Sequence, residues 1–233
     1  MTMFCKKLIV FISLMTLSSS IICFAQDCNR ISVGLTGGYS VEWFKFTQPS
    51  RYFGSYFGPG SSYHTGISIK IPVNEGITIQ PQALLVPRQF KAKGNHSDAT
   101  RYDYSFSATY IDMPVQFQYN PITSIDSRLF VFVEPFVGVG LGNKMSGYYT
   151  EDDIGMRYGD GYSETPSFKE SGLSRFEYGA GIGAGFEWKR IQLQLKYDWN
   201  FNNLGDDNTR WAIEYSAWNS HCKSIFLSLI LWL

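Results

Sequence analysis

The chain has 233 residues, no formal net charge, 17% charged residues and 17% aromatic residues. An ordinary soluble domain carries roughly a quarter charged residues. Balanced charge excludes a basic nucleic-acid-binding protein, so we expect no nucleic-acid partner, and abundant aromatics exclude intrinsic disorder. A mean hydropathy of −0.13 excludes a bundle of membrane helices. A soluble all-β domain and a membrane β-barrel, whose polar interior lowers its average hydropathy, remain.

The N-terminal residues 1–25 have the pattern of a secretory signal peptide. Lys6 and Lys7 precede the apolar run 8–17, and Cys23 and Ala25 supply small residues at −3 and −1 of a cleavage site before Gln26. We therefore expect residues 26–233 to form a single β-barrel domain. The remaining cysteines, Cys28 and Cys222, fall near opposite rims of such a barrel, so we expect two unpaired thiols.

From residue 30 onward, apolar and polar residues alternate with period 2, the period of a β-strand with two different faces. The pattern predicts eight strands, at residues 32–43, 66–73, 77–85, 111–119, 129–141, 175–188, 191–201 and 224–233. No segment has the pattern of an amphipathic helix.

Two tight turns fix the expected strand register. The loop 74–76, which ends in Gly76, pairs Val73 with Ile77 and hence Lys70 with Gln80. The turn Lys189-Arg190 pairs Trp188 with Ile191 and hence Gly181 with Asp198. Both turns keep the apolar positions of paired strands on one side, which a slip of one residue would not do.

Short and long connections alternate along the chain. The long ones are residues 47–61, 91–101, 143–172 and 202–222. Short turns at one end and long loops at the other are typical of outer-membrane barrels, and an even strand number allows antiparallel closure. The sequence thus predicts an all-β fold, an eight-stranded antiparallel up-and-down transmembrane β-barrel, surrounded by lipid in the outer membrane of a Gram-negative bacterium.

The distribution of charge indicates which face meets lipid. A lipocalin-like barrel would turn its apolar face inward around a ligand. Here the apolar face carries no charge in any span, whereas the polar face is crowded with glutamine, glycine and charged residues, as a lumen requires. We expect a lumenal polar network of nine residues: Glu42, Lys70, Asp112, Glu134, Arg175, Glu177, Glu187, Lys196 and Asp198. Aromatics at span ends predict interfacial girdles, formed by Trp43, Tyr119, Trp188, Phe201 and Trp232.

Several residues interrupt the alternation. Four phenylalanines fall on the lumenal face, where we expect them to pack against the glycine row 179–185: Phe130, Phe132, Phe136 and Phe226. Three prolines lie inside strands, where each removes a ladder hydrogen bond and suggests a bulge: Pro81, Pro114 and Pro135.

Three motifs, taken with the alternation, resemble the PorT-like family of outer-membrane β-barrels found in Bacteroidetes-type bacteria. They are the run 110–115 (YIDMPV), the run 132–138 (FVEPFVG), and the run 178–185 (YGAGIGAG) leading into 195–198 (LKYD). The resemblance covers the mature chain from about residue 30. It implies an eight-stranded outer-membrane barrel, with some members taking part in protein secretion.

The expected interior limits what the barrel does. Eight strands leave room only for side chains, so Lys70, Arg175 and Lys196 are expected to pair with lumenal carboxylates rather than line a pore. A narrow channel or small-solute porin is one alternative. A lipid-modifying enzyme is another, because His64, His96 and His221 fall near the long-loop end with Ser62 and Glu214. We expect no catalytic residues, no cofactor and no metal, and interpret the acidic residues 151–153 and Asp160 as a solvated loop.

The long connections carry the strongest functional signal. Aromatic residues are unusual in inert loops, and here they occur at Tyr52, Phe53, Tyr56, Phe57, Tyr148, Tyr149, Tyr158 and Tyr162. They suit contacts with a partner or a lid over the barrel mouth. The sequence predicts a non-enzymatic, membrane-anchored structural and interaction module whose partners are other envelope proteins.

Overall fold

The computed structural model describes residues 31–46, 56–95, 100–153, 156–164, 168, 174–202 and 220–233. These residues form ten β-strands: β1 (Ser32–Phe46), β2 (Tyr56–Gly58), β3 (Gly60–Asn74), β4 (Ile77–Asn95), β5 (Thr100–Thr123), β6 (Ser127–Asp153), β7 (Met156–Glu164), β8 (Phe176–Trp188), β9 (Ile191–Asn200) and β10 (Ser220–Trp232). The expected signal peptide and Cys28 lie outside them. Among the described residues, no helix has the length and apolarity needed to cross a bilayer.

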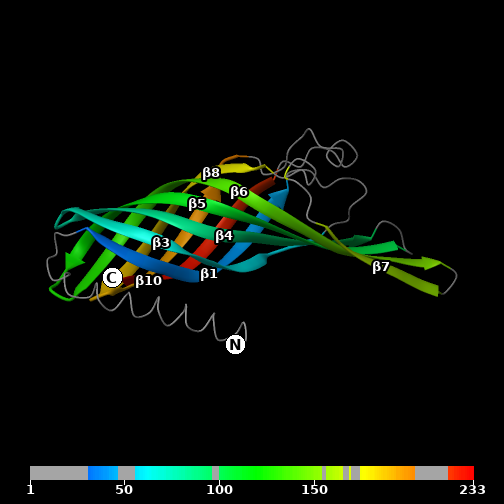
Figure 1. Cartoon of the computed structure of the whole chain (residues 1–233), viewed down its shortest axis with the longest axis horizontal. Coiled ribbons are helices and arrows are strands. Elements are labelled where there is room, and N and C mark those ends of the chain that lie inside the picture. The colour runs from blue at the N-terminus through cyan, green and yellow to red at the C-terminus, as the bar shows by residue number, and fades with distance from the viewer. Residues whose placement is uncertain are drawn as a thin grey trace, which may run out of the picture.

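Eight of the strands form a closed antiparallel barrel (Figure 1). Around the barrel the order is β1, β3, β4, β5, β6, β8, β9 and β10, and the first strand pairs with the last from Gly34–Trp232 to Phe46–Ser220. When the short β2 and β7 are left aside, each strand of the barrel pairs with the next one in sequence. The predicted eight-stranded up-and-down barrel is therefore confirmed.

The predicted registers hold, except beside the first turn. Trp188 pairs with Ile191 and Gly181 with Asp198, as the Lys189-Arg190 turn requires. At the 74–76 turn, Asn74 rather than Val73 pairs with Ile77, and a shift between Pro72 and Asn74 restores the expected register further along.

The bulges expected at the strand prolines are absent. Pro81 pairs with Val115, Pro114 with Phe136 and Pro135 with Ala180, and the register does not shift at any of these prolines. Each proline removes its own N–H donor, but the flanking pairs hold the register without an inserted residue.

The two faces of the barrel differ as the alternation predicted. Large apolar side chains are exposed on the outside, while polar and charged ones are buried inside. Trp43, Tyr119, Trp188 and Phe201 are among the exposed aromatics near span ends. Trp232 was expected beside them, but it is buried in the lumen, because even-numbered residues of β10 point inward and Gly34 leaves space for its ring.

Two of the expected long loops are largely strand. β4 and β5 stay paired out to Asn95–Arg101, and β6 pairs with β5 and then with β7 as far as Asp153–Met156. The sheet continues past the barrel mouth as a projection, which we call the arm: residues 89–95 of β4, 100–107 of β5, 144–153 of β6, together with β2 and β7 (Figure 1). The alternation predicts loops at 91–101 and 143–172 because their polar residues do not resemble a lipid-facing strand.

Candidate functional site

The lumen at the short-turn end is closed by an ion-pair cluster. The carboxylate of Glu187 accepts hydrogen bonds from Lys70 Nζ and from Arg128 Nη2, each at 2.7 Å. Lys70 Nζ also lies 4.7 Å from the Trp232 ring centre. Arg128 was not among the predicted lumenal residues. It lies two residues before the inward Phe130 on β6, so it belongs to the same inward face.

The next layer is built of amides and phenylalanines. Gln116, Gln118 and Gln192 donate to neighbouring glutamine side chains over 2.8–3.3 Å. Beside them Phe130 and Phe132 are buried against Gly185 and Gly183, which lack the Cβ atoms that would collide with the rings. The expected packing of phenylalanines against the glycine row is confirmed at these positions.

In the middle of the lumen Lys196 holds two carboxylates. Its Nζ donates to Glu134 and lies 3.0 Å from Asp198 Oδ2, and Gln116 Nε2 donates to the other oxygen of Glu134 at 2.8 Å. All three charged groups are buried. The ammonium also lies 4.4 Å from the ring centre of Phe226, so polar and aromatic groups fill the cross-section together.

Arg88 organises the outer part of the lumen. Its guanidinium donates to Glu177 Oε1 at 2.6 Å and to Asp112 Oδ2 at 2.9 Å, and lies 3.9 Å from Glu42 Oε1. Only 2% of Arg88 is exposed. Sequence reasoning missed this residue because the inward residues before it, Leu84 and Val86, are apolar and end the polar pattern early. Continuing the alternation for two more inward positions, from Leu84 to residue 88, would have found it.

The outer mouth is also occupied. Phe168 packs against Gly140 and lies 5.8 Å from Tyr110, centre to centre, and the Tyr110 hydroxyl donates to the carbonyl of Ser174 at 2.7 Å. Arg175 was expected in the lumenal network, but it is exposed at this rim, and its Nε donates to the carbonyl of Gly140 at 3.3 Å. The strand begins only at Phe176, so the inward alternation does not reach Arg175.

The remaining eight predicted lumenal residues line the interior, and all but Lys70 are among the buried residues. They form three groups, centred on Glu187, Lys196 and Arg88. Across the described lumen, four cations (Lys70, Arg88, Arg128 and Lys196) face six carboxylates (Glu42, Asp112, Glu134, Glu177, Glu187 and Asp198). Buried charges of this kind are retained only with partners, so the groups hold strands together across the barrel.

The histidine-based site that an enzyme would need is not assembled among the described residues. His64 is buried in the lumen, with its Nε2 2.8 Å from Ser228 Oγ. Ser62 is buried beside Glu42 and Ser40. His96 and Glu214 lie outside the described residues. No cluster of three metal-ligating side chains occurs in the described part of the chain.

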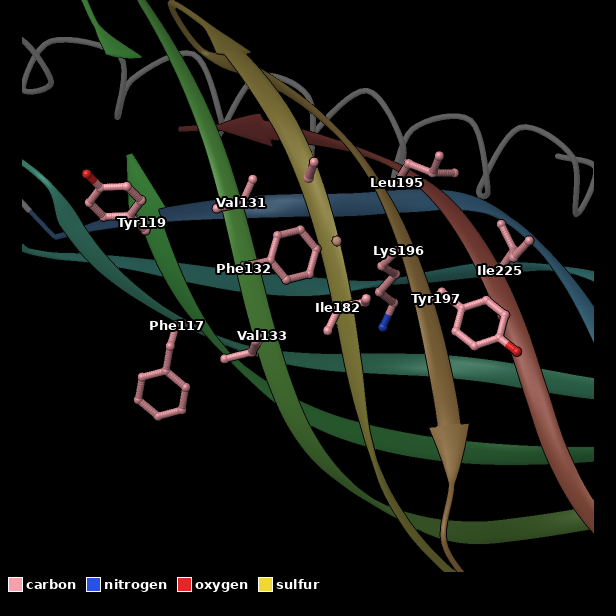
Figure 2. A pocket seen from close by; sticks show the side chains of 12 residues that line it. Phe117, Tyr119, Val131, Phe132, Val133, Ile182, Leu195, Lys196, Tyr197 and Ile225 are labelled. Atoms are coloured by element: carbon pink, nitrogen blue, oxygen red, sulfur yellow. The ribbon is translucent and has the colours of Figure 1, made fainter. Parts of the chain in front are cut away.

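A groove of about 740 Å³ lies over β5, β6, β8, β9 and β10 (Figure 2). Its lining includes the outward residues Val131, Ile182 and Leu195, with the small residues Gly183 and Ala184 at its floor. Because these side chains belong to the exposed apolar belt, the groove opens toward the surroundings of the barrel and not into the lumen.

The strand register of the arm defines two faces. One face continues the lumenal side of the barrel, since positions 102, 104 and 106 share the parity of the buried Ala108 and Tyr110 on β5. We call it the lumen-side face.

The other face, which we call the belt-side face, continues the outer surface of the barrel. Below the rim the outward side is apolar, whereas above it the exposed Lys144 lies on the same side. The outward side of the sheet therefore changes polarity at the rim, as expected where lipid gives way to water.

The predicted contact residues are divided between these faces. Phe57, Tyr149, Tyr158 and Tyr162 occupy lumen-side positions, whereas Tyr56 and Tyr148 occupy belt-side positions. Tyr52 and Phe53 lie outside the described residues. The acidic residues 151–153 and Asp160, expected in a solvated loop, belong to the paired strands β6 and β7.

The chain is distantly similar to several solved structures. No curated protein matches the chain significantly. Similar solved structures include Ail, the attachment invasion locus protein of Yersinia pestis (10% identity, 87% of this chain and 98% of that chain, TM-score 0.38), and OprG from Pseudomonas aeruginosa (10%, 89% and 96%, 0.37). Neisserial surface protein A is similar at 11% identity over 86% of this chain and 96% of its own, with a TM-score of 0.33.

The family comparison covers most of the chain. The model of the outer membrane protein beta-barrel domain matches residues 24–206. The chain therefore belongs to this family of outer membrane beta-barrel domains and is a protein of the Gram-negative outer membrane.

Proposed function

We propose that this barrel is a membrane anchor that presents the arm to other envelope proteins at the cell surface. The observation that carries the proposal is the contrast between the two ends of the same strands. Inside the membrane they enclose a lumen filled with side chains, and outside it β4, β5 and β6 continue as a paired sheet. The additional length of these three strands therefore lies outside the membrane.

The packing of the lumen argues against a conducting role. A permeating ion would have to pass the groups centred on Glu187, Lys196 and Arg88, each made of buried or partly buried side chains in direct contact. Displacing any of them leaves buried charges without partners, which is costly. An eight-stranded barrel has no spare cross-section for a path around them.

The resemblance to PorT-like barrels suggests the process in which this protein takes part. Within the proposal, the arm is the contact surface by which the barrel joins a protein-secretion or surface-assembly system. The contact does not require catalysis by the barrel, because binding through aromatic and charged side chains on a rigid sheet is sufficient.

Planar-bilayer recording of the purified protein tests the anchor against the channel. We expect no single-channel current from the wild-type barrel at neutral pH. A matched variant, Lys196→Ala with Phe132→Ala, enlarges the middle of the lumen and controls for correct insertion. Reproducible current through the wild-type protein, altered in size by that variant, would overturn the anchor proposal in favour of a narrow channel.

A further inference from the structure

The groove on the outer surface of the barrel follows two neighbouring rows of cross-strand partners. One row runs from Tyr119 on β5 across Ala184 on β8 to Leu195 on β9. The next row ends with Tyr197 on β9 and Ile225 on β10, which lie side by side in Figure 2. Tyr119 is near the short-turn end of its strand and Ile225 is near the long-loop end, so the groove rises obliquely toward the outer side of the membrane.

A small side chain at the centre leaves room for the groove. Ala184 lies between Ile182 and Phe186 along β8, and between Val131 and Leu195 on the two adjoining strands. All four neighbours are large, exposed apolar side chains. In lipid, van der Waals packing rather than release of water favours association, and a gap beside these walls loses such contacts. A flexible acyl chain that fills the groove recovers them.

An unpaired lysine lies at the outer end of the groove. Lys223 comes two residues before Ile225 on the same outward face of β10, and its side chain is exposed. Its cross-strand partners are Trp43 on β1 and Trp199 on β9. Among the described residues, no carboxylate pairs with its ammonium. A cation without a protein partner at the boundary between lipid and water attracts an anion from its surroundings.

The two tryptophans indicate that this end of the groove lies at headgroup depth. Trp43 is 39% exposed, and Trp199 packs edge-on against Tyr197 of the groove, with ring centres 4.5 Å apart. Indole rings favour the interface of a bilayer because they combine an apolar body with an N–H donor. The surface therefore passes from acyl-chain depth at the groove to headgroup depth at Lys223.

The charge of Lys223 is what would select among lipids. Every membrane lipid has acyl chains, so the apolar part of the groove alone does not discriminate between lipid classes. A lysine at headgroup depth favours an anionic lipid over a neutral one by roughly fivefold. Because the long-loop end of an outer-membrane barrel faces the cell exterior, such a lipid belongs to the outer leaflet.

We propose that the groove and Lys223 together bind one phosphate-bearing lipid of the outer leaflet. An acyl chain lies along the groove over Ala184, and the phosphate lies against the Lys223 ammonium. The site requires only that the barrel lies in the outer membrane, and it does not depend on what the arm contacts. It gives the anchor a preferred lipid neighbour on one side of its wall, over β8, β9 and β10.

Native mass spectrometry of the full chain in neutral detergent measures the lipids that it retains. The probes are phosphatidylglycerol, which is anionic, and phosphatidylcholine with the same acyl chains, which is zwitterionic. We expect the wild-type barrel to retain phosphatidylglycerol roughly three- to tenfold more strongly, and Lys223→Gln to reduce this preference to less than about twofold. Lys144→Gln is the matched control and should keep the preference, because Lys144 is also exposed at the outer rim but pairs with Ser107 and not with a tryptophan.

A second pair of variants tests the groove itself. Ala184→Phe fills the groove and should weaken retention of phosphatidylglycerol by about threefold or more. Ala83→Phe adds the same ring on β4, away from the groove, and should change retention less than about twofold. Circular dichroism checks that all the variants remain folded.

Four outcomes would overturn the inference. The first is equal retention of the two lipids by the wild-type barrel, and the second is a preference that persists in Lys223→Gln. The third is an equal loss in Lys144→Gln, since the lipid would then sense overall charge. The fourth is unchanged retention in Ala184→Phe. None of these outcomes affects the anchor function, which is tested separately by ion current through the wild-type barrel.

Discussion

The guanidinium of Arg88 on β4 reaches the carboxylate of Glu177 on β8, with Nη2 2.6 Å from Oε1 and Nε 3.2 Å from both carboxylate oxygens. Two strands, β5 and β6, separate these residues around the barrel wall. The pair therefore spans the lumen and not a strand interface. It joins two parts of the sheet that no backbone ladder connects directly.

Replacing Arg88 removes the cation shared by three buried carboxylates. We expect Arg88→Met to lower the free energy of unfolding by about 3–5 kcal/mol, because Glu177, Asp112 and Glu42 are left as uncompensated buried charges. Urea unfolding in lipid vesicles, followed by tryptophan fluorescence, measures the change. Adding Glu177→Gln to Arg88→Met should recover part of the loss.

Arg175→Met is the matched control for Arg88→Met. This arginine is exposed at the rim and its described contact is a 3.3 Å hydrogen bond to a carbonyl, so we expect a change of less than about 1 kcal/mol. Equal losses from both arginine variants would contradict the assignment of Arg88 as the organising cation of the lumen.

A side chain at Gly183 cannot be accommodated. A Cβ atom there would lie 2.5 Å from the backbone carbonyl oxygen of Leu195 and against the ring of Phe132. We expect Gly183→Ala to destabilise the barrel by about 1–3 kcal/mol through overpacking. Gly142→Ala is the control, since nothing lies within 4 Å of its added Cβ. Unfolding curves that do not distinguish the two variants would refute the packing role of the glycine row.

The cluster at the short-turn end should respond to loss of its one carboxylate. Glu187→Gln leaves Lys70 and Arg128 as neighbouring cations with a neutral partner, so we expect a loss of about 1–3 kcal/mol of stability. Glu75→Gln, at an exposed turn position, should change stability little. The same urea unfolding assay compares them, and a larger effect at residue 75 would disprove the assignment.

The inversion of polarity at the rim predicts which residues are accessible in intact cells. In a background with Cys28 and Cys222 replaced by Ser, Lys144→Cys should react with a membrane-impermeant maleimide added outside, because residue 144 is exposed beyond the apolar belt. Leu227→Cys lies within the belt and should stay unlabelled. Glu75→Cys should react only after the outer membrane is permeabilised. Labelling of residue 75 in intact cells would reverse the orientation.

The Lys189-Arg190 turn contains a backbone conformation that favours glycine. Lys189 has a φ of 53°, in the left-handed region that costs an ordinary residue roughly 1–2 kcal/mol. We expect Lys189→Gly to leave stability unchanged or to raise it by about 0.5–1 kcal/mol despite the extra flexibility of the unfolded chain. A clear loss in urea unfolding would show that the Lys189 side chain, 5.3 Å from the Trp188 ring centre, matters more than the backbone.

The barrel could be predicted from sequence because two signals coincide there. Lipid demands apolar residues on one face of each span, and the tight turns fix the register, so errors in either would have conflicted with the other. The identities of the ion pairs could not be predicted. Lys70 and Glu187 meet across the lumen from β3 and β8, and their contact depends on the tilt of the strands, which periodicity does not encode.

The arm was missed for a different physical reason. Its strands still alternate, but water lies on the side where lipid lies further down, so the apolar and polar positions exchange. Lys91 and Lys93 stand at positions where the alternation requires apolar residues, so their charge indicated the end of a strand, although β4 continues to Asn95. Arg88, which lies just before the exchange, was concealed by the apolar inward residues Leu84 and Val86.

The exchange of polarity within β4 and β5 also helps to specify the register in which these two strands pair. Their register runs without a shift from Leu84–Asp112 to Asn95–Arg101. A slip of one residue would turn lumenal charges toward lipid at one end of the hairpin and would exchange the two faces of the sheet at the other. Lipid and water therefore favour the same register, so pairing that begins from either end gives the same alignment.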